Sequence, residues 1–310
     1  MTPVAPGRMI DVGSHRLHLH CLGAGTPPVI LDAALGASSL SWSLVQPAVS
    51  AVTRCCAYDR AGFGWSDAGP LPRTADRICD ELRLLLQHAA VPAPYVLVGH
   101  SFGGLVVRLF AARHPGLVAG IVLIEPAIPE DWIDPSADRR LLIARGVRLC
   151  RYGGWAARAG LARVVTSLVS GGAFEAARML VKIISRGGLR RADEEILSPI
   201  WRLPAGARAV LQQMWTQPKF FQALGSQIEN IAAGASAVLR EGDESLRDLP
   251  LVVMTASSAD EGRLKADAAL AARSRRGRHV LVPGCGHWIP LDAPQAVIDA
   301  IEAMIRTVRA

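Results

Sequence analysis

Two hydrophobic patterns alternate along the first 126 residues. Short runs are almost continuously apolar, as in strands buried on both faces of a sheet, and they lie at 28–34, 52–58, 95–98 and 120–124. Between the second and third run, Arg73 to Ala90 places Ile78, Leu82, Leu85 and Leu86 at helical spacing. Strands that alternate with helices in this way predict a mainly parallel sheet with helices on both faces.

The same alternation returns near the end of the chain. A strand is predicted at 250–255, a helix at 261–275, another strand at 279–282 and an amphipathic helix at 293–308. Before the first buried run, 9–12 and 16–21 have the alternation of half-buried strands, and Gly13-Ser14 suits a tight turn between them. We therefore expect a hairpin near the start of the chain and two further strands near its end.

The middle of the chain has a different character. From Ile128 to about Leu249 the pattern is helical, interrupted by Gly and Pro, with no convincing strand. The predicted fold class is α/β, with a mainly parallel sheet flanked by helices and an inserted all-helical cap. The predicted division is a core formed by 1–126 and 250–310, with a cap or lid at 127–249.

Composition narrows the functional classes. The chain has 310 residues, half of them apolar, and a net charge of +7, which permits an acidic partner without identifying one. Aromatic residues make up 5% and no nucleic-acid motif is present, so nucleic-acid binding is not expected. The six cysteines are scattered without a C-x-x-C pair, which predicts reduced, buried thiols. With no apolar signal region in residues 1–10 and no uninterrupted apolar run of membrane-spanning length, we expect a soluble, cytoplasmic protein.

Positive charge is concentrated in the predicted cap. Between Arg139 and Arg191 stand twelve Lys or Arg residues and only one acidic residue, Glu175, so the segment carries +11. A helical wheel places Ile143, Val147 and Cys150 on one side and Arg145, Arg148 and Arg151 on the other. One interpretation is a lid helix whose apolar stripe covers a pocket while its charges face water. The other is a basic amphipathic surface that makes weak peripheral contact with an anionic membrane or attracts a carboxylate-bearing substrate.

The strongest chemical signal is the segment from Tyr95 to Arg108. It reads as an apolar strand, a turn with the spacing Gly99-x-Ser101-x-Gly103, and a helix. Glycines two residues on either side of a serine allow a strained strand-to-helix turn that lifts the hydroxyl clear of the sheet. This context predicts that Ser101 is a nucleophile.

A serine nucleophile needs a base and a group that orients the base. The candidate base is His287, on a Gly-rich loop after the last predicted strand, and we expect its imidazole to be a hydrogen-bonding neighbour of the Ser101 hydroxyl. The preferred acid is Asp260, just past the strand 251–255, because functional groups of parallel sheets gather at the carboxyl ends of strands. Glu125 and Asp131, which follow the preceding strand, are the main alternatives; Asp134 and Asp243 are weaker ones.

Two backbone amides are expected to form an oxyanion hole. The amide of Phe102 directly follows the nucleophile, and the second is expected from the loop after the strand ending near Ala33. The amide of Ala34 is the preferred donor there, with that of Leu35 next.

Three motifs together resemble the α/β-hydrolase fold family: Gly99-His-Ser-Phe-Gly-Gly104, the loop Asp59-Arg-Ala-Gly-Phe-Gly-Trp-Ser66, and Gly284-Cys-Gly-His287. The resemblance spans roughly 8–126 and 250–308, and it implies a Ser-His-acid hydrolase with a lid inserted after the sixth strand. Members often carry His-Gly after the third strand, where this chain has Asp32-Ala33, so the second oxyanion donor is less well defined. Epoxide hydrolases and haloalkane dehalogenases of this fold use an aspartate nucleophile, and Ser101 argues against both.

The sequence therefore predicts a serine hydrolase that cleaves a carboxylic ester of a small or medium apolar acyl group. It leaves open an acyltransferase that uses the same Ser-His-acid site and a non-catalytic ligand-binding protein on this fold. No metal or organic cofactor is required by this chemistry. Trp65 and Trp288 are candidates for the walls of an acyl pocket, and the oligomeric state is not set by the sequence.

Overall fold

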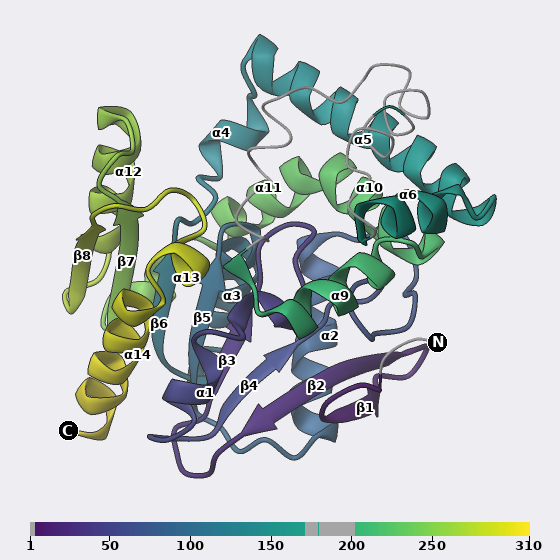
Figure 1. Cartoon of the computed structure of the whole chain (residues 1–310). Coiled ribbons are helices and arrows are strands. Elements are labelled where there is room, and N and C mark those ends of the chain that lie inside the picture. Colours follow the sequence, from purple (N-terminus) through teal and green to yellow (C-terminus); the bar gives the residue numbers. More distant parts are fainter. Residues whose placement is uncertain (1–3, 171–178, 180–201) are drawn as a thin grey trace.

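The structure is a computed structural model that describes residues 4–170, 179 and 202–310. Within these residues one sheet of eight strands has the order β1-β2-β4-β3-β5-β6-β7-β8 (Figure 1). The pairs β1–β2 and β2–β4 are antiparallel and the remaining pairs are parallel. The strands are β1 (Arg8–Asp11), β2 (Arg16–Leu22), β3 (Val29–Asp32), β4 (Cys55–Tyr58), β5 (Tyr95–His100), β6 (Val118–Ile124), β7 (Leu251–Ala256) and β8 (Gly277–Val282).

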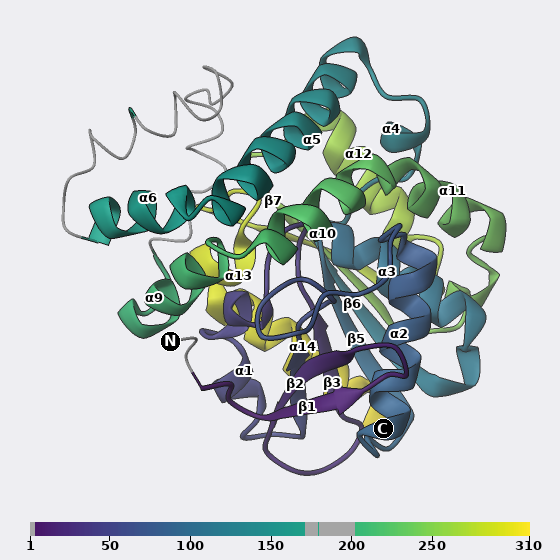
Figure 2. The same ribbon diagram turned by 90° about the vertical axis from the view of Figure 1, so that its right-hand side faces the viewer.

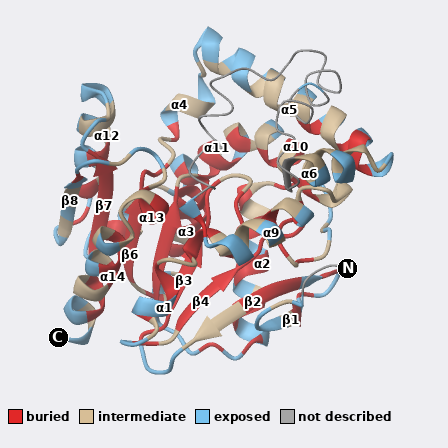
Figure 3. Ribbon diagram, viewed as in Figure 1, coloured by how far each residue is buried: buried red, intermediate tan, exposed pale blue. Residues whose placement is uncertain are grey.

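Helices cover both faces of this sheet, which confirms the predicted α/β class. One face packs against α2 (Ala75–His88), α3 (Phe102–Arg113) and α11 (Ile231–Glu241), with α12 (Glu261–Ala271) beside β7. The other packs against α1 (Gln46–Val49) and α14 (Pro294–Arg309), with η1 (Ser39–Trp42) and α13 (Ile289–Asp292) nearby. The central strands are buried along their whole length (Figure 3), because both faces are covered.

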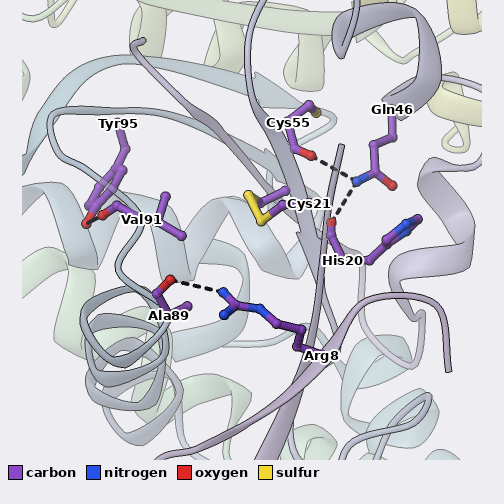
Figure 4. Close-up of a disulfide and its surroundings, with 9 residues drawn as sticks. Arg8, His20, Cys21, Gln46, Cys55, Ala89, Val91 and Tyr95 are labelled. Carbon is purple, nitrogen blue, oxygen red and sulfur yellow. Dashed lines mark hydrogen bonds between the residues drawn. A yellow bond between two sulfur atoms is a disulfide. The ribbon is translucent and has the colours of Figure 1, made fainter. Parts of the chain in front are cut away.

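The cysteine prediction is wrong for two of the six residues. Cys21 of β2 and Cys56 of β4 are directly opposite each other in the antiparallel pair and form a disulfide with Cα atoms 4.0 Å apart (Figure 4). Gln46 also joins these two strands, because its amide donates to the carbonyls of His20 and Cys55. Cys55, Cys79, Cys150 and Cys285 are free. Disulfides persist in oxidising compartments, so the cysteines give no support to a reducing one.

Between β6 and β7 the described residues form helices. They are α4 (Glu130–Ile133), α5 (Ala137–Arg158), α6 (Leu161–Ser170), α9 (Ala205–Met214), α10 (Pro218–Glu229) and α11, followed by the 3₁₀ turn η4 (Glu244–Leu246). The last of these, α11, lies on the core rather than on the cap, since Ile231 and Val238 are buried in the same cluster as α2 and α3. Small residues permit this: a side chain at Gly234 would meet the Cβ of Ala75 at 2.8 Å. The predicted cap therefore includes a helix that belongs to the core layer.

In the cap, α5 lies above α10 (Figure 2). The apolar stripe of α5 therefore faces α10 and does not directly face the sheet, as a lid over the site would require. The inner face of α5 rests on α10: a side chain at Gly146 would lie 3.2 Å from Ile228, and one at Gly225 of α10 would lie 3.1 Å from Cys150. It is α10 that faces the sheet, where Phe220 packs edge-on against Phe63. The stripe on α5 therefore packs against another helix, and its residues Val147 and Cys150 line a groove between α5 and α10 to which Ser101 does not contribute. The basic residues between 178 and 191 lie outside the described residues.

Within the described residues, no helix has the length and apolar character that crossing a membrane requires.

Candidate active site

Ser101 is held in a strained turn at the carboxyl end of β5. Its backbone has φ 54° and ψ −116°, in a region that L-residues rarely adopt, and α3 begins at the next residue. The Ser101 amide donates to the carbonyl of Ile124 at the end of β6, over 2.9 Å. These are the features predicted from the Gly-x-Ser-x-Gly spacing: a strand, a sharp turn carrying the serine, and a helix.

The two glycines of the motif are required by close packing. A Cβ at Gly99 would lie 2.7 Å from the carbonyl oxygen of Gly103, and one at Gly103 would lie 2.5 Å from the carbonyl oxygen of Asp32. Real Cβ atoms do not approach backbone so closely, so both positions exclude side chains. The second contact also brings the start of α3 against the end of β3.

This contact places the two expected oxyanion donors in neighbouring segments. Phe102 is the first residue of α3, so its amide has no acceptor within the helix. Ala33 and Ala34 follow β3 directly, where the carbonyls of Asp32 and Ala33 border Gly103. The Ala34 amide therefore belongs to the loop that adjoins the nucleophile turn, as predicted.

A buried arginine holds that loop. Arg60 is 2% exposed and donates from Nη2 to the carbonyls of Ala33, over 2.8 Å, and of Ala34. Its guanidinium also lies 5.0 Å from the ring centre of Phe102 and 3.7 Å from Asp32. A planar guanidinium with several fixed donors suits this task, because it binds carbonyls and stacks on a ring together. No pattern in the sequence predicts this role for Arg60, which lies in the loop from Asp59 to Ser66.

Asp32 occupies the position where relatives of this fold often carry histidine. Burial raises the pKa of Asp32 to about 6, although Arg60 and a 2.9 Å hydrogen bond from the Tyr58 hydroxyl oppose the rise. Asp32 thus anchors Arg60 and Tyr58 beneath the loop.

Asp59 shapes the loop that begins with it. Its carboxylate accepts from the amides of Ser39, over 2.6 Å, and Trp65, over 3.0 Å, and pairs with His18 Nδ1 at 2.8 Å. The shaped loop predicted beside the site is therefore organised around a buried carboxylate.

The residue that contacts the candidate base is Glu125. His287 Nδ1 lies 3.3 Å from Glu125 Oε2, and the other carboxylate oxygen accepts from the Ala256 amide over 2.7 Å. Burial alone would raise the pKa of Glu125, but the hydrogen bonds from His287 and Ala256 and the charge of Arg263 lower it below its ordinary value. An ionised acceptor at Nδ1 keeps the proton on that nitrogen and leaves the lone pair of Nε2 for base chemistry.

The prediction that Asp260 orients the imidazole is wrong in this structure. Asp260 is the N-cap of α12, and its Oδ1 accepts from the Arg263 amide over 2.9 Å. An aspartate at this position satisfies the free amides of the first helical turn, and that role takes its carboxylate away from His287. The alternative Asp131 pairs with Arg139 at 3.0 Å on the cap, and Asp243 pairs with Arg108.

Ser101 and His287 stand at the same edge of the sheet without a direct hydrogen bond. In the described part of the chain, the imidazole of His287 contacts Glu125 and the rings of His100 and Trp288, and the Ser101 hydroxyl donates to neither of its nitrogens. The His287 side chain is 47% exposed. The predicted hydrogen bond is therefore absent from this structure, and catalytic hydrogen bonds of this kind often form fully only when a substrate binds.

His100, beside the nucleophile, supports the loop that carries the base. Its Nε2 donates to the backbone carbonyl of His287 over 2.8 Å, and its ring packs edge-on against Trp288. Burial, with the nearby His287, lowers the pKa of His100 to about 3, so the ring is neutral. The loop is further held by Asp292, which accepts from the Gly286 amide over 3.0 Å.

The loop after β3, which adjoins the nucleophile turn, is bordered by apolar side chains. Ala33, Ala34 and Ala37 form a small cluster against Trp288, and Leu224 of α10 lies over Gly36. Trp288 thus borders the site as expected. Trp65 packs against His18, with ring centres 4.8 Å apart and the ring planes tilted by 50°. A groove of about 550 Å³ between α5 and α10 lies on the other side of α10.

No group of three His, Cys, Asp or Glu side chains is placed to bind a metal ion among the residues that the structure describes.

Comparison with known proteins agrees with this geometry. The family model of the alpha/beta hydrolase fold matches residues 27–145. An AB hydrolase superfamily protein of Gibberella zeae is 34% identical over 103 residues, which are 32% of either chain. The chain spans less than half the length of the curated relatives that it matches.

Solved structures share the fold over nearly the whole chain. A thermophilic esterase from Thermogutta terrifontis has a TM-score of 0.64 at 19% identity, with 96% of this chain and 95% of that chain covered. The epoxide hydrolase CorEH has a TM-score of 0.67 at 20% identity, with 98% and 99% covered. The eight-stranded sheet, the nucleophile turn and the match of the family model to residues 27–145 together show that the chain has the α/β-hydrolase fold.

Proposed function

We propose that this chain is a serine hydrolase that cleaves a carboxylic ester through an acyl-enzyme. The observation that carries the proposal is the joint placement of a strained Ser101 directly after β5 and a His287–Glu125 pair beside the end of β6. Nucleophile, base and acid are then supplied by three segments that meet at one sheet edge, which is where functional groups of parallel sheets gather. The esterase neighbour supports the proposal at the level of the fold.

In the first half of the reaction, His287 Nε2 takes the Ser101 proton as Oγ bonds to the ester carbonyl carbon. The carbonyl oxygen becomes an oxyanion that accepts from the amides of Phe102 and Ala34, and each such donor contributes about 3 kcal/mol to lowering the barrier. Collapse of this intermediate breaks the bond to the alcohol oxygen, which leaves with the proton from His287. Water, deprotonated by His287, then releases the acid and restores Ser101.

Glu125 holds the imidazole and stabilises its protonated form. Its pKa lies below the ordinary value, so the carboxylate is charged at neutral pH and available to the imidazolium. An acyl part with an apolar surface is favoured because Trp288, Leu224 and the alanines after β3 border the loop that adjoins the nucleophile turn. Epoxide hydrolases of this fold attack the epoxide with an aspartate. A serine in the nucleophile turn favours attack on a carbonyl carbon instead.

A fluorophosphonate probe tests the proposal directly. Wild-type protein should be labelled once and should release a burst of alcohol from a chromogenic ester, whereas Ser101→Ala should give neither. Ser167→Ala, which removes an exposed hydroxyl from α6, should leave both signals unchanged. Absence of labelling in correctly folded wild-type protein would contradict the proposal. Product analysis with added alcohols then separates hydrolysis from acyl transfer, because a transferase would form the new ester in preference to the free acid.

A further inference from the structure

The outer surface of α5 carries arginines and large apolar side chains together. We define the α5 face by Leu141, Arg148, Arg151, Trp155 and Arg158, which recur at intervals of three, four or seven residues and are all exposed. Leu141 is 69% exposed and Trp155 is 59% exposed. Residues with these spacings lie along one side of a helix. Figure 2 shows this helix at the outer margin of the molecule, with α10 beneath it.

The orientation of the α5 face is fixed by the opposite side of the helix. Phe221 of α10 fills the space beside Gly153 and Gly154, and Cys150 packs against Gly225. Glycines permit such close contact because they carry no side chain. With its small residues committed to α10, the helix presents Leu141, Arg148 and Trp155 outward. Arg151 and Arg158 are exposed at the margin of the α5 face, where they also line the groove between α5 and α10.

The charges of the α5 face are not neutralised by the protein. Arg148, Arg151 and Arg158 have no ion-pair partner in the part of the chain that the structure describes, whereas the neighbouring Arg139 pairs with Asp131. From residue 139 to residue 170 the sequence contains seven arginines and no acidic residue. A large uncompensated charge of one sign marks a surface that attracts the opposite charge.

We propose that the α5 face docks on an anionic lipid surface. Arginines attract the headgroups, while Trp155 and Leu141 enter the boundary between headgroups and acyl chains, where an amphipathic indole is favoured. The combination of arginines with exposed apolar side chains favours a lipid surface over a nucleic acid. A nucleic acid would be bound by the arginines alone, because an exposed leucine contributes nothing to a phosphate contact. The side chains invoked lie on one rigid helix, so they reach a planar surface together.

Co-sedimentation with vesicles measures the docking. The full chain should bind vesicles of equal parts phosphatidylcholine and phosphatidylserine at low salt, and should bind pure phosphatidylcholine far more weakly. Each arginine near such a surface strengthens partitioning by about fivefold, so Arg148→Gln with Arg151→Gln should weaken it by roughly thirtyfold. Raising salt from about 0.05 M to about 0.5 M should release the wild type, since screening shortens the reach of the charges. Trp155→Ala should weaken binding at every salt concentration.

A matched control separates the α5 face from net charge. Arg276→Gln with Arg278→Gln removes the same two charges from exposed positions at the β8 edge and should leave vesicle binding within about twofold of wild type. Hydrolysis of a soluble ester by all variants checks that the fold is intact. Equal binding to neutral and anionic vesicles, equal loss in the control pair, or binding of duplex DNA in place of vesicles would overturn the proposal. None of these outcomes bears on Ser101.

Discussion

Replacing Glu125 with glutamine tests which carboxylate serves the base. The substitution preserves volume, and its amide oxygen can still accept from the Ala256 amide. The other amide end has hydrogens to donate, so toward His287 Nδ1 it favours the tautomer with the proton on Nε2. That tautomer has no lone pair at the nitrogen that must take the Ser101 proton.

The expected loss follows from this reversal of donor and acceptor. Amide replacement of a buried triad carboxylate lowers kcat by about 10⁴-fold, which corresponds to about 5.5 kcal/mol of barrier. Glu125 contacts His287 at 3.3 Å, longer than an optimal charged hydrogen bond, so a loss of about 10³-fold is the lower expectation. The measurement is kcat/KM for a chromogenic ester at neutral pH, with thermal unfolding to check that the variant folds.

Asp260→Asn is the matched comparison. Asparagine caps helices as well as aspartate does, so α12 should begin at the same residue, with a change in stability of roughly 0.3–1 kcal/mol from the lost charge. Activity should stay within about twofold of wild type, because Asp260 is bound to the Arg263 amide and not to His287. A large loss in Asp260→Asn with activity retained in Glu125→Gln would refute the assignment of Glu125.

Two further predictions concern buried side chains. The pKa of His100 falls from 6.5 to about 3 on folding, so between these pH values His100 binds a proton in the unfolded chain but not in the native state. The free energy of unfolding therefore decreases as pH falls from 6.5 toward 3. His100→Gln keeps a donor for the His287 carbonyl but removes this titration, so below about pH 6 its free energy of unfolding should decline less steeply than that of wild type, by about 1.4 kcal/mol per pH unit. Asp32 titrates in the opposite sense in both proteins, so its effect cancels in the comparison. Parallel declines of wild type and variant would contradict the buried neutral ring. Thiol titration in denaturant should find four thiols without reductant and six after reduction, and six without reductant would rule out the Cys21–Cys56 bond.

The sheet could be predicted from the sequence because its strands follow local rules. Buried parallel strands read as continuous apolar runs, and the alternating residues of β1 and β2 predict a hairpin. The half-buried character expected of β2 is wrong at its start, where Leu17, His18 and Leu19 are all buried. The position of Ser101 was also predictable, since the glycines that permit the turn are within two residues of it. Each of these features depends on neighbours in sequence.

Contacts between distant segments explain the failures. Cys21 and Cys56 face each other only because β2 pairs with β4 in one register, and a shift of one residue would separate them. Glu125 and Asp260 both follow parallel strands, and the sequence does not reveal that Asp260 is engaged by the first turn of α12. The sequence nevertheless contained a usable indication. Asp260 immediately precedes a helical pattern, and an aspartate at that position is a preferred N-cap, so a capping role could have been predicted for it.

Contacts on both sides of the chain hold the backbone that follows Glu125. Glu125 has φ 46°, and the chain leaves the sheet directly after it toward α4. On one side the Ala127 amide donates to the Ser101 carbonyl over 3.1 Å; on the other, Arg263 Nη2 donates to the Pro126 carbonyl over 2.7 Å. The first residues of the insertion are therefore fixed by the nucleophile turn and by α12. These contacts tie the backbone on both sides of Pro126 to the core, so the position of the carboxylate that holds His287 is set by the core and not by α5 or α10.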